Sequence, residues 1–490
     1  MSPVWKQPRQ HLPLGPAVAL AVVALVAAAC GGSTTASDPG TPAAVQPCPV
    51  HALDTVTSPV ELVVWHTQQA KSLTTLQQLV DTYNAGQNKV KVRLDAQGTS
   101  YQELMRKFQG AAASKQLPGL VMFDDTATQT MADSGVVLPA QACVDADHYD
   151  TSDFLQVARN YYTIKDVLWP VSANMGNVLL YYNKGAFRRA GLDPEVAPRT
   201  LAELRDVAVK LKASAPDVAP LVQEMSSWKT EFWMTGAHAG LVNNDNGRGG
   251  NTTDKATLAD NASLLSLWTW FAQMKKDGLM QPVPATEGQI NQYLAMASQK
   301  SYLLVESSSA ATSVESFLRG DPTGVAGIDA SADPSSLDIG ASVFPGLDAA
   351  AGNKTQMGGA AWYLTNTGSP EVQAAAWDFA KFLNAPDAQA QMLIGGSYLP
   401  YRNSVAARPD VQAFFDGSLS GHWLKLAYDQ VKTIDPSFPG PLIGPYDEFR
   451  KAVSQAQDDM MFNDKDPKAA LDAAQAAADA AITQYNDENF

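Results

Sequence analysis

The side chains that could do chemistry in this 490-residue chain are not gathered into catalytic arrays. No G-x-S-x-G or H-E-x-x-H motif occurs. The six histidines are scattered and no C-x-x-C is present, so we predict no metal site. The acid pairs Asp124–Asp125 and Asp458–Asp459 are chain neighbours, not carboxylates on opposite sides of a cleft as glycoside hydrolysis needs. We therefore predict a binding protein that needs no cofactor, not an enzyme.

Two tryptophans, Trp228 and Trp233, lie five residues apart in an otherwise polar stretch. Flat aromatic faces bind the apolar C–H patches of sugars, while planar polar groups match their hydroxyls. The pair could form a stacking wall for such a ligand. The alternative is that both are core tryptophans.

The first thirty residues have the layout of an export signal. Lys6 and Arg9 precede an apolar stretch of about 16 residues, shorter than the ~20 needed to span a bilayer as a helix. The run LVAAAC, ending at Cys30, resembles the lipobox of bacterial lipoproteins, although Ala27 stands where leucine is usual. This resemblance implies cleavage before Cys30, a lipid on its sulfur, and a protein anchored outside the cytoplasm. An ordinary secretory signal or an uncleaved anchor is the alternative.

The cysteine count and the net charge fit that location. Lipidation of Cys30 would leave Cys48 and Cys143 as one possible disulfide, with two free thiols as the alternative. The formal net charge is −15, and removing residues 1–29 would make the chain more acidic, because that segment has two basic residues and no acid. Such a surface repels phosphate backbones, so nucleic acid is not predicted as a partner.

The hydrophobic periodicity predicts strands alternating with helices. Strands are expected at residues 60–65, 89–94 and 119–123, with a helix after each of the first two. This order indicates a parallel α/β layer. A second stretch repeats the pattern, with strands at 177–183, 302–306, 338–344 and 357–365, and helices at 185–190, 200–212 (N-capped by Thr200), 260–277, 370–384 and 469–481.

Seven segments, in this order, resemble the extracellular solute-binding proteins of ABC importers. The most similar subgroup is the sugar- and glycerol-3-phosphate-binding, maltose-binding-like family. The resemblance covers about residue 58 to the C-terminus and rests on VVWH (63–66), YNAG (83–86), GTSYQEL (98–104), LLYYNKGAFRRAGL (179–192), MGGAAWYL (357–364), AWDFAKFL (376–383) and SYLPYR (397–402).

The resemblance implies an α/β, two-lobed periplasmic-binding-protein fold, with strands that cross between the lobes and a central ligand cleft that closes by a hinge motion. Residues 1–29 would be the signal peptide and 30–57 a flexible tether. Lobe one would comprise residues 58–172 and 357–397, and lobe two residues 173–356 and 398–490. The first crossing is expected near residues 169–176.

The resemblance also implies which residues touch the ligand. The implied residues are Tyr101, Asp125 (or Asp124), Ser307 or Ser308, Gly358, Gly359 and Tyr398. Trp228 and Trp233 join this set, with Trp233 favoured because the family often has a tryptophan before a Gly-rich turn. Structural alternatives exist: Tyr101 could merely start a helix, the two aspartates could cap one, and the two glycines could allow close backbone approach.

Two departures from the subgroup bear on the ligand. Gly176 stands where the subgroup has a serine, and the loop 438–449 has Leu442 near the place of an arginine that grips phosphate. A buried phosphate without a charge-assisted partner is costly. A phosphate ligand is therefore disfavoured, unless Arg402 or Lys229 substitutes.

The predicted function is that of a membrane-anchored, extracytoplasmic substrate-binding protein of an ABC importer, which captures a carbohydrate or polyol-like solute by lobe closure. The alternatives are a glycerophosphodiester or glycerol-3-phosphate-binding protein of the same fold, and a ligand sensor coupled to a receptor. The expected partners are the small-molecule solute, the ABC permease subunits and the membrane through the lipid anchor. We expect a monomer.

Overall fold

The computed structural model describes residues 46–285, 290–321 and 337–490. The predicted signal peptide and Cys30 therefore lie outside the described residues. Cys48 and Cys143 form the expected disulfide, which joins the segment before η1 (Ala52–Asp54) to α4 (Ala140–Asp147). In the part of the chain that the structure describes, no helix combines the length and apolarity needed to cross a membrane.

The first sheet is built on three parallel strands, β1 (Val60–His66), β2 (Val90–Ala96) and β3 (Leu120–Asp124), in the order β2-β1-β3. The first four residues of β3 are fully buried, as expected for a strand covered on both faces. β13 (Gly358–Thr365) continues the sheet antiparallel to β3. It also pairs with β4 (Val137–Leu138) and with β7 (Ser172–Gly176).

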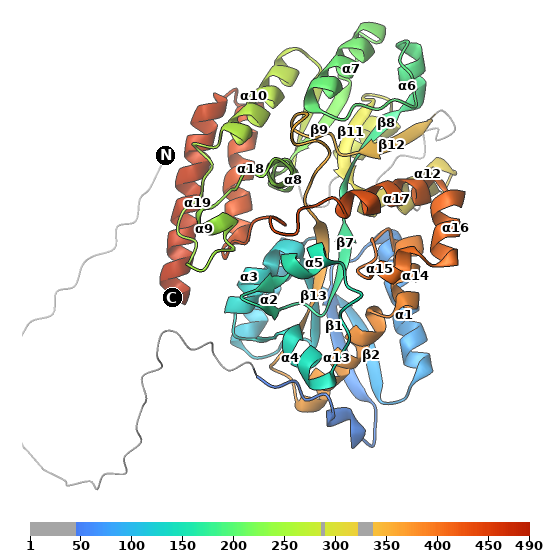
Figure 1. Ribbon diagram of the computed structural model, residues 1–490, viewed down its shortest axis with the longest axis vertical. Helices are drawn as coiled ribbons and strands as arrows, with labels where there is room; N and C mark the ends of the chain where they lie inside the picture. Colours follow the sequence, from blue (N-terminus) through green and yellow to red (C-terminus); the bar gives the residue numbers. More distant parts are fainter. Residues whose placement is uncertain (1–45, 286–289, 322–336) are drawn as a thin grey trace, which may run out of the picture. The chain divides into compact units, whose positions relative to one another are not determined.

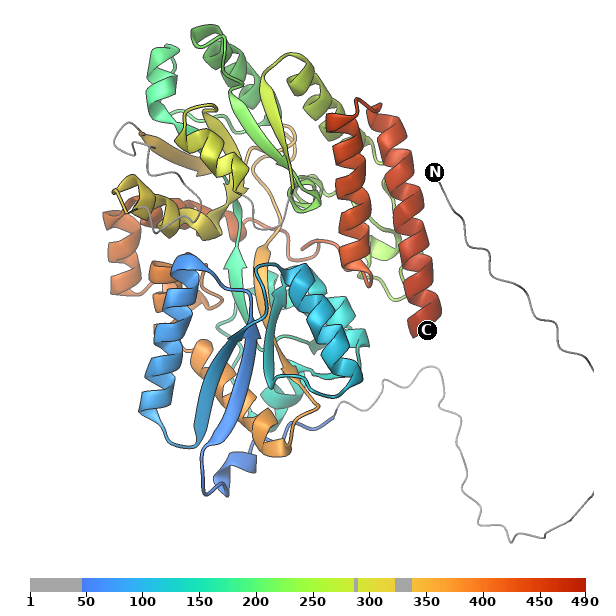
Figure 2. The same cartoon turned by 180° about the vertical axis from the view of Figure 1, so that it is seen from behind.

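Helices flank this sheet, and Figure 2 shows α1 in blue beside the blue strands β1 and β2. Ser100 caps helix α2 (Tyr101–Ala113): its side chain accepts a hydrogen bond from the Glu103 N–H. The elements around the first sheet are α1 (Ala70–Gly86), α2 (Tyr101–Ala113), η2 (Asp125–Ala127), α3 (Thr128–Asp133), α5 (Gln156–Tyr161), β5 (Thr163–Ile164), β6 (Val167–Leu168), α13 (Pro370–Leu383) and α14 (Pro386–Gly396).

The second sheet has the order β10-β9-β11-β8-β12. β8 runs antiparallel to β11 and β12, whereas β9, β10 and β11 are parallel. The elements of this region are β8 (Val178–Asn183), α6 (Lys184–Arg189), α7 (Leu201–Ser214), β9 (Leu221–Met225), α8 (Ser227–Gly236), α9 (Asn243–Asn246), α10 (Ala262–Lys276), β10 (Met280–Pro284), α11 (Asn291–Ala297), β11 (Leu303–Ser307), η3 (Ser308–Ala310), α12 (Ala311–Leu318) and β12 (Ile339–Val343).

The chain passes between the two sheets where the sequence predicts a crossing. Only Asn177 separates β7, which belongs to the first sheet, from β8, which belongs to the second, and Figure 1 shows the two strands following each other. The chain returns from β12 to β13. Because both passages lie beside the ends of β3 and β11, residues from both sheets meet there.

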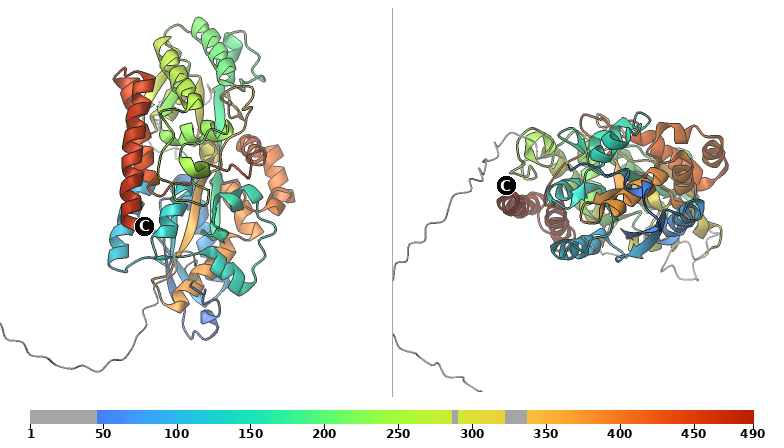
Figure 3. Two further views of the ribbon diagram at one scale, coloured as in Figure 1. Left: turned by 60° about the vertical axis from the view of Figure 1, so that its left-hand side comes forward. Right: turned by 90° about the horizontal axis from the view of Figure 1, so that it is seen from below.

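The C-terminal helices divide between two hydrophobic cores. α15 (Asn403–Ala406), α16 (Pro409–Gly417) and α17 (Leu419–Val431) contribute buried side chains to a core that includes residues of both sheets, and α17 packs against β8 and β12 of the second sheet. α18 (Tyr446–Phe462) and α19 (Pro467–Asn489) lie side by side and pack into the core around the second sheet (Figure 3). The strands and helices expected from the pattern match the observed bounds to within about two residues, except that the helix expected at 469–481 is longer, and β9, α8 and β10 were not expected. Thr200 is confirmed as the N-cap of α7.

Candidate functional site

Two adjacent aspartates lie at the carboxyl end of β3. Asp124 ends the strand, and its Oδ1 accepts hydrogen bonds from the Thr126 N–H at 3.2 Å and hydroxyl at 2.6 Å. Asp125 is buried in η2. Its Oδ2 accepts from the Tyr161 hydroxyl at 2.6 Å and its Oδ1 from the Gly359 N–H at 3.1 Å. Asp124 thus also caps η2, as the structural alternative expected, while Asp125 ties β3 to β13.

The electrostatic environment of Asp125 is unusual for a carboxyl group. Burial and the neighbouring Asp124 carboxylate raise the pKa of Asp125 well above its usual value, and the Arg450 charge opposes this rise. Asp125 therefore holds a proton more readily than an exposed aspartate does. The two acids have distinct roles, because Asp124 is partly exposed and Asp125 is enclosed by the protein.

The two predicted tyrosines meet beside the aspartates. Tyr101 is the first residue of α2, and its hydroxyl forms side-chain hydrogen bonds with Thr67 and Tyr398. The Tyr398 hydroxyl accepts from Gln68 Nε2 at 3.2 Å. Burial raises the pKa of both tyrosines, so both hydroxyls remain protonated at neutral pH and can donate to a ligand.

The glycine pair at the start of β13 allows two strands to approach closely. Gly359 has φ +127°, and a Cβ there would lie 2.1 Å from the Asn174 carbonyl oxygen on β7. A Cβ on Gly358 would lie 2.8 Å from Phe232 Cζ. Both positions therefore exclude larger residues for steric reasons, and the Gly359 N–H is already donated to Asp125.

The two predicted serines lie at the end of β11: Ser307 is its last residue, paired with Val178 at the start of β8, and Ser308 begins η3. The Ser308 hydroxyl is fully buried and accepts from the Asn177 N–H at 3.1 Å. Ser307 Oγ lies 2.9 Å from Ser309 Oγ. A Cβ on Gly176 would lie 3.8 Å from Ser307 Oγ and 3.9 Å from Ser308 Oγ, so the fold brings both serines to the position where the subgroup has a serine of its own.

The structure corrects the prediction for Trp233. This side chain is 1% exposed, packs against Phe271 and Phe344, and donates its indole N–H to the Pro345 carbonyl at 2.9 Å. No face of the ring is open to a ligand. The reason is helical geometry: both tryptophans lie on α8, where a spacing of five residues turns the side chains about 140° apart. Trp228 is partly buried instead, with Lys229 Nζ 5.0 Å from its ring centroid.

Sequence reasoning missed Arg450, which is the basic residue nearest to the aspartates. Its Nη1 donates to Asp124 Oδ1 at 2.9 Å, and its Nε and Nη2 donate to the two carboxylate oxygens of Glu231 at 2.8 Å each. Arg450 lies on α18, one residue beyond the loop 438–449, which itself has no basic residue. The signal that could have found it is the helical spacing to Tyr446, whose hydroxyl also donates to Glu231, at 3.2 Å.

The two cations considered as substitutes are already paired. Lys229 is buried, and its Nζ donates to Glu224 and Glu306 at 3.0 Å each. Arg402 donates to the Asn384 carbonyl and the Tyr149 hydroxyl, away from the aspartates. Leu442, which replaces the subgroup's arginine, is a buried apolar residue.

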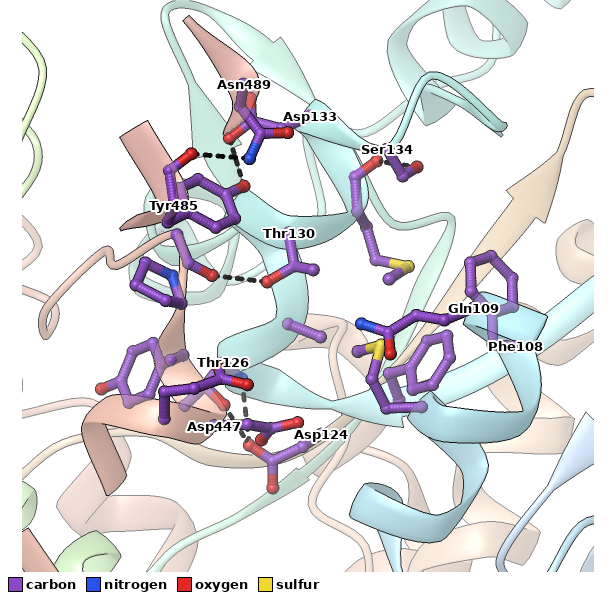
Figure 4. Close-up of a pocket in the computed structure, with 18 of the residues that line it drawn as sticks. Phe108, Gln109, Asp124, Thr126, Thr130, Asp133, Ser134, Asp447, Tyr485 and Asn489 are labelled. Atoms are coloured by element: carbon purple, nitrogen blue, oxygen red, sulfur yellow. Dashed lines mark hydrogen bonds between the residues drawn. The ribbon is translucent and has the colours of Figure 1, made fainter. Parts of the chain in front are cut away.

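A cavity of about 440 Å³ opens beside Asp124, which Figure 4 labels. Tyr101 also lines this cavity. One wall comes from α2, η2 and α3, and the other from the residues around Gly444 and the end of α19. Thr130 Oγ1 donates to the Gly444 carbonyl at 2.6 Å, and the Tyr485 hydroxyl donates to Asp133 at 2.7 Å, so hydrogen bonds connect the two walls. The described residues that line it include no Lys, Arg or His, and its acids are Asp124, Asp133, Asp447, Glu448 and Glu488.

The described part of the chain has no group of three or more His, Cys, Asp and Glu side chains arranged to hold a metal ion. The polar groups of the site are instead carboxylates, tyrosine hydroxyls, an amide and a guanidinium that is already paired. These are groups that exchange hydrogen bonds with hydroxyl-bearing molecules.

Comparisons with known proteins give a consistent result. The family model described as bacterial extracellular solute-binding protein matches residues 78–414. The sn-glycerol-3-phosphate-binding periplasmic protein UgpB of Rhizobium meliloti is 25% identical over 428 residues, covering 86% of this chain and 94% of the relative. That of Yersinia enterocolitica is 24% identical over 439 residues, covering 88% and 94%.

Solved structures share the fold at low sequence identity. The GacH receptor of Streptomyces glaucescens, solved unliganded and with acarbose, aligns with a TM-score of 0.69 at 19% identity and covers 87% of this chain and 99% of that one. UgpB from Mycobacterium tuberculosis, in complex with glycerophosphocholine, gives 0.65 at 18%, covering 88% and 99%. The architecture is thus the α/β two-lobed fold of periplasmic binding proteins. The chain belongs to the family of bacterial extracellular solute-binding proteins, the binding components of ABC importers.

Proposed function

We propose that this protein captures an uncharged, hydroxyl-rich solute, a carbohydrate or a polyol, beside Asp124, Tyr101 and Tyr398, and that the cavity next to them holds part of the solute. Asp124 would accept hydrogen bonds from solute hydroxyls, and the tyrosine hydroxyls would donate to solute oxygens. Closure of the two lobes would then be stabilised by the contacts that only the closed state makes.

The observation that carries this proposal is the pairing of Arg450. Its guanidinium already interacts with two carboxylates, from Asp124 and Glu231, so it has no uncompensated charge for a phosphate. Lys229 is neutralised in the same way by Glu224 and Glu306. A phosphate entering here would lose its hydration and face additional carboxylates, which is unfavourable.

A phosphate ester remains the second candidate because of Arg248. Its Nε donates to the Gly440 carbonyl at 2.6 Å and its guanidinium lies over the Tyr161 ring, whose hydroxyl reaches Asp125. The Arg248 Nη2 is buried and has no hydrogen-bond partner among the described residues. The relatives named for glycerol 3-phosphate favour the same candidate.

Isothermal titration calorimetry on the chain from residue 31 decides between the candidates. We expect binding of at least one sugar or polyol from a panel of neutral solutes, and no tight binding of glycerol 3-phosphate. Thermal-shift screening supplies the panel, since a solute present at 100 times its Kd raises stability by about 2.7 kcal/mol. Tight binding of the phosphate ester alone would reject the neutral solute and favour Arg248.

The location of the protein is a separate part of the proposal. We infer that the signal is cleaved before Cys30, that the cysteine carries lipid, and that residues 30–57 tether the binding body to the membrane near its permease. Cys30→Ala should leave the protein unprocessed or release it in soluble form. Membrane fractionation combined with intact-mass measurement tests this, and unchanged fractionation would argue against the anchor. Binding assays alone do not separate a transport protein from a receptor-coupled sensor, whereas solute uptake in a deletion strain does.

A further inference from the structure

The buried carboxylate of Glu231 forms a two-point ion pair with the guanidinium of Arg450. The two carboxylate oxygens of Glu231 accept from Nε and Nη2, which is the fork geometry that gives the strongest arginine–carboxylate pairs. The Glu231 side chain is only 1% exposed, whereas that of Asp124, the other partner, is 22% exposed and lines the cavity. Glu231 is thus the buried partner of Arg450, and the Nη1 of Arg450 contacts Asp124 at the candidate site.

A buried ion pair of this kind is weak evidence for a stabilising role. Removing two charges from water costs about as much as their attraction returns, and apolar residues of similar size often stabilise a fold equally well. The charge balance has a clearer consequence. With Glu231 present, the one positive charge of Arg450 stands against the two carboxylates that it contacts, those of Asp124 and Glu231.

We propose that Glu231 is a specificity-determining residue: by neutralising Arg450 it excludes anionic solutes from the site beside Asp124. The inference rests on the proposed function, in which the solute binds at Asp124, and adds the residue that sets the charge class of that solute. Selectivity of this sort arises from a repulsive element built against the wrong ligand, not from extra contacts to the right one.

The test is Glu231→Gln, which keeps the size of the side chain and removes its charge. Calorimetry with glycerol 3-phosphate at low ionic strength should show at least tenfold tighter binding to the variant than to the wild type. Raising the salt concentration should weaken this gained binding, because dissolved ions screen the attraction that draws the anion to Arg450. A packing role for Glu231 would lower stability without changing the preference between charged and neutral solutes.

Glu224→Gln is the matched control. It removes one carboxylate from the other buried cation, Lys229, and changes the net charge of the protein by the same amount. Glycerol 3-phosphate should bind this variant as it binds the wild type. An equal gain in both variants would show a general effect of net charge and overturn the assignment to Glu231.

Asp124→Asn keeps the inference testable if the Glu231 variant does not fold, because the Asp124 side chain is partly exposed and removing its charge also frees Arg450. It too should bind glycerol 3-phosphate more tightly than the wild type. If Glu231→Gln folds and does not gain affinity for this anion, the inference is wrong. A different result would contradict the proposed function: no detectable binding of maltose, or of any other neutral solute in the panel, to the wild-type protein.

Discussion

Two buried cations in this protein have the same local chemistry and different surroundings. Lys229 and Arg450 each lie between two carboxylates. The partners of Lys229, Glu224 and Glu306, both belong to the second sheet, whose parallel strands β9 and β11 end there. Arg450 instead pairs with Asp124 at the end of the first sheet as well as with Glu231. One group is internal to a lobe, and the other joins elements of both sheets beside a cavity.

Helix α8 connects the two groups and explains how they stay separate. Lys229 and Glu231 are two residues apart, and such residues do not face each other on a helix. Lys229 therefore reaches toward Glu306, while Glu231 reaches toward α18. Lys229, whose partners all belong to the second sheet, therefore has a structural role. Arg450, which has one partner lining the cavity, is instead a candidate for determining which ligands bind.

The largest expected effect is on the internal group. Lys229→Met would leave the Glu224 and Glu306 carboxylates buried without their cation, and should lower the free energy of unfolding by about 5 kcal/mol. Urea unfolding measures this. Arg450→Met is the comparison variant, and we expect a smaller loss because Asp124 can contact water. Equal losses would erase the distinction between the two groups.

The core face of α8 should give the next largest effect. Trp233→Ala should lower the free energy of unfolding by about 4 kcal/mol, because it removes a fully buried side chain and leaves a cavity. Trp228→Ala should cost less, since that ring is only partly buried. Thermal and urea unfolding check both variants. A stable Trp233→Ala protein with weakened solute binding would restore the sequence-based prediction that Trp233 stacks on the ligand.

Substitutions beside the cavity should affect binding more than folding. Tyr398→Ala should weaken binding of a neutral solute by about 1–3 kcal/mol, as loss of an aromatic anchor does at other interfaces. Tyr398→Phe separates the ring from the hydroxyl that accepts from Gln68. Calorimetry with the solute found by screening measures both variants, and unchanged affinity in Tyr398→Ala would place the solute elsewhere.

The smallest expected effect is the pH dependence that Asp125 contributes. Its pKa is raised in the folded protein, so the native state keeps a proton that the unfolded chain loses near pH 3.8. The contribution of this group to stability therefore falls as the pH rises above that value. Asp125→Asn should reduce the loss of stability that accompanies a rise in pH above 3.8, measured by urea unfolding at a series of pH values. A steeper loss in the variant would contradict this assignment.

Local patterns in the sequence predict much of the fold and part of the site. The strands and helices follow from hydrophobic periodicity and capping residues, and the position of Asp124 and Asp125 follows from the end of a buried strand. The pair Cys48–Cys143 follows from the count of cysteines. The polar composition around Trp228 and Trp233 does not predict a helix, although α8 forms there, so the different orientations of the two tryptophans do not follow from the sequence pattern.

Only the tertiary structure decided the charge arrangement of the site. Arg450 contacts a residue 326 positions away in the chain and another 219 positions away, and no local pattern encodes such pairs. Their meeting depends on where the crossing strands place the end of β3 relative to α8 and α18. The sequence alone determined that the loop 438–449 has no cation, because composition is readable without a fold. Whether the nearest cation is free or neutralised depends on distances of a few ångströms, which tertiary packing sets.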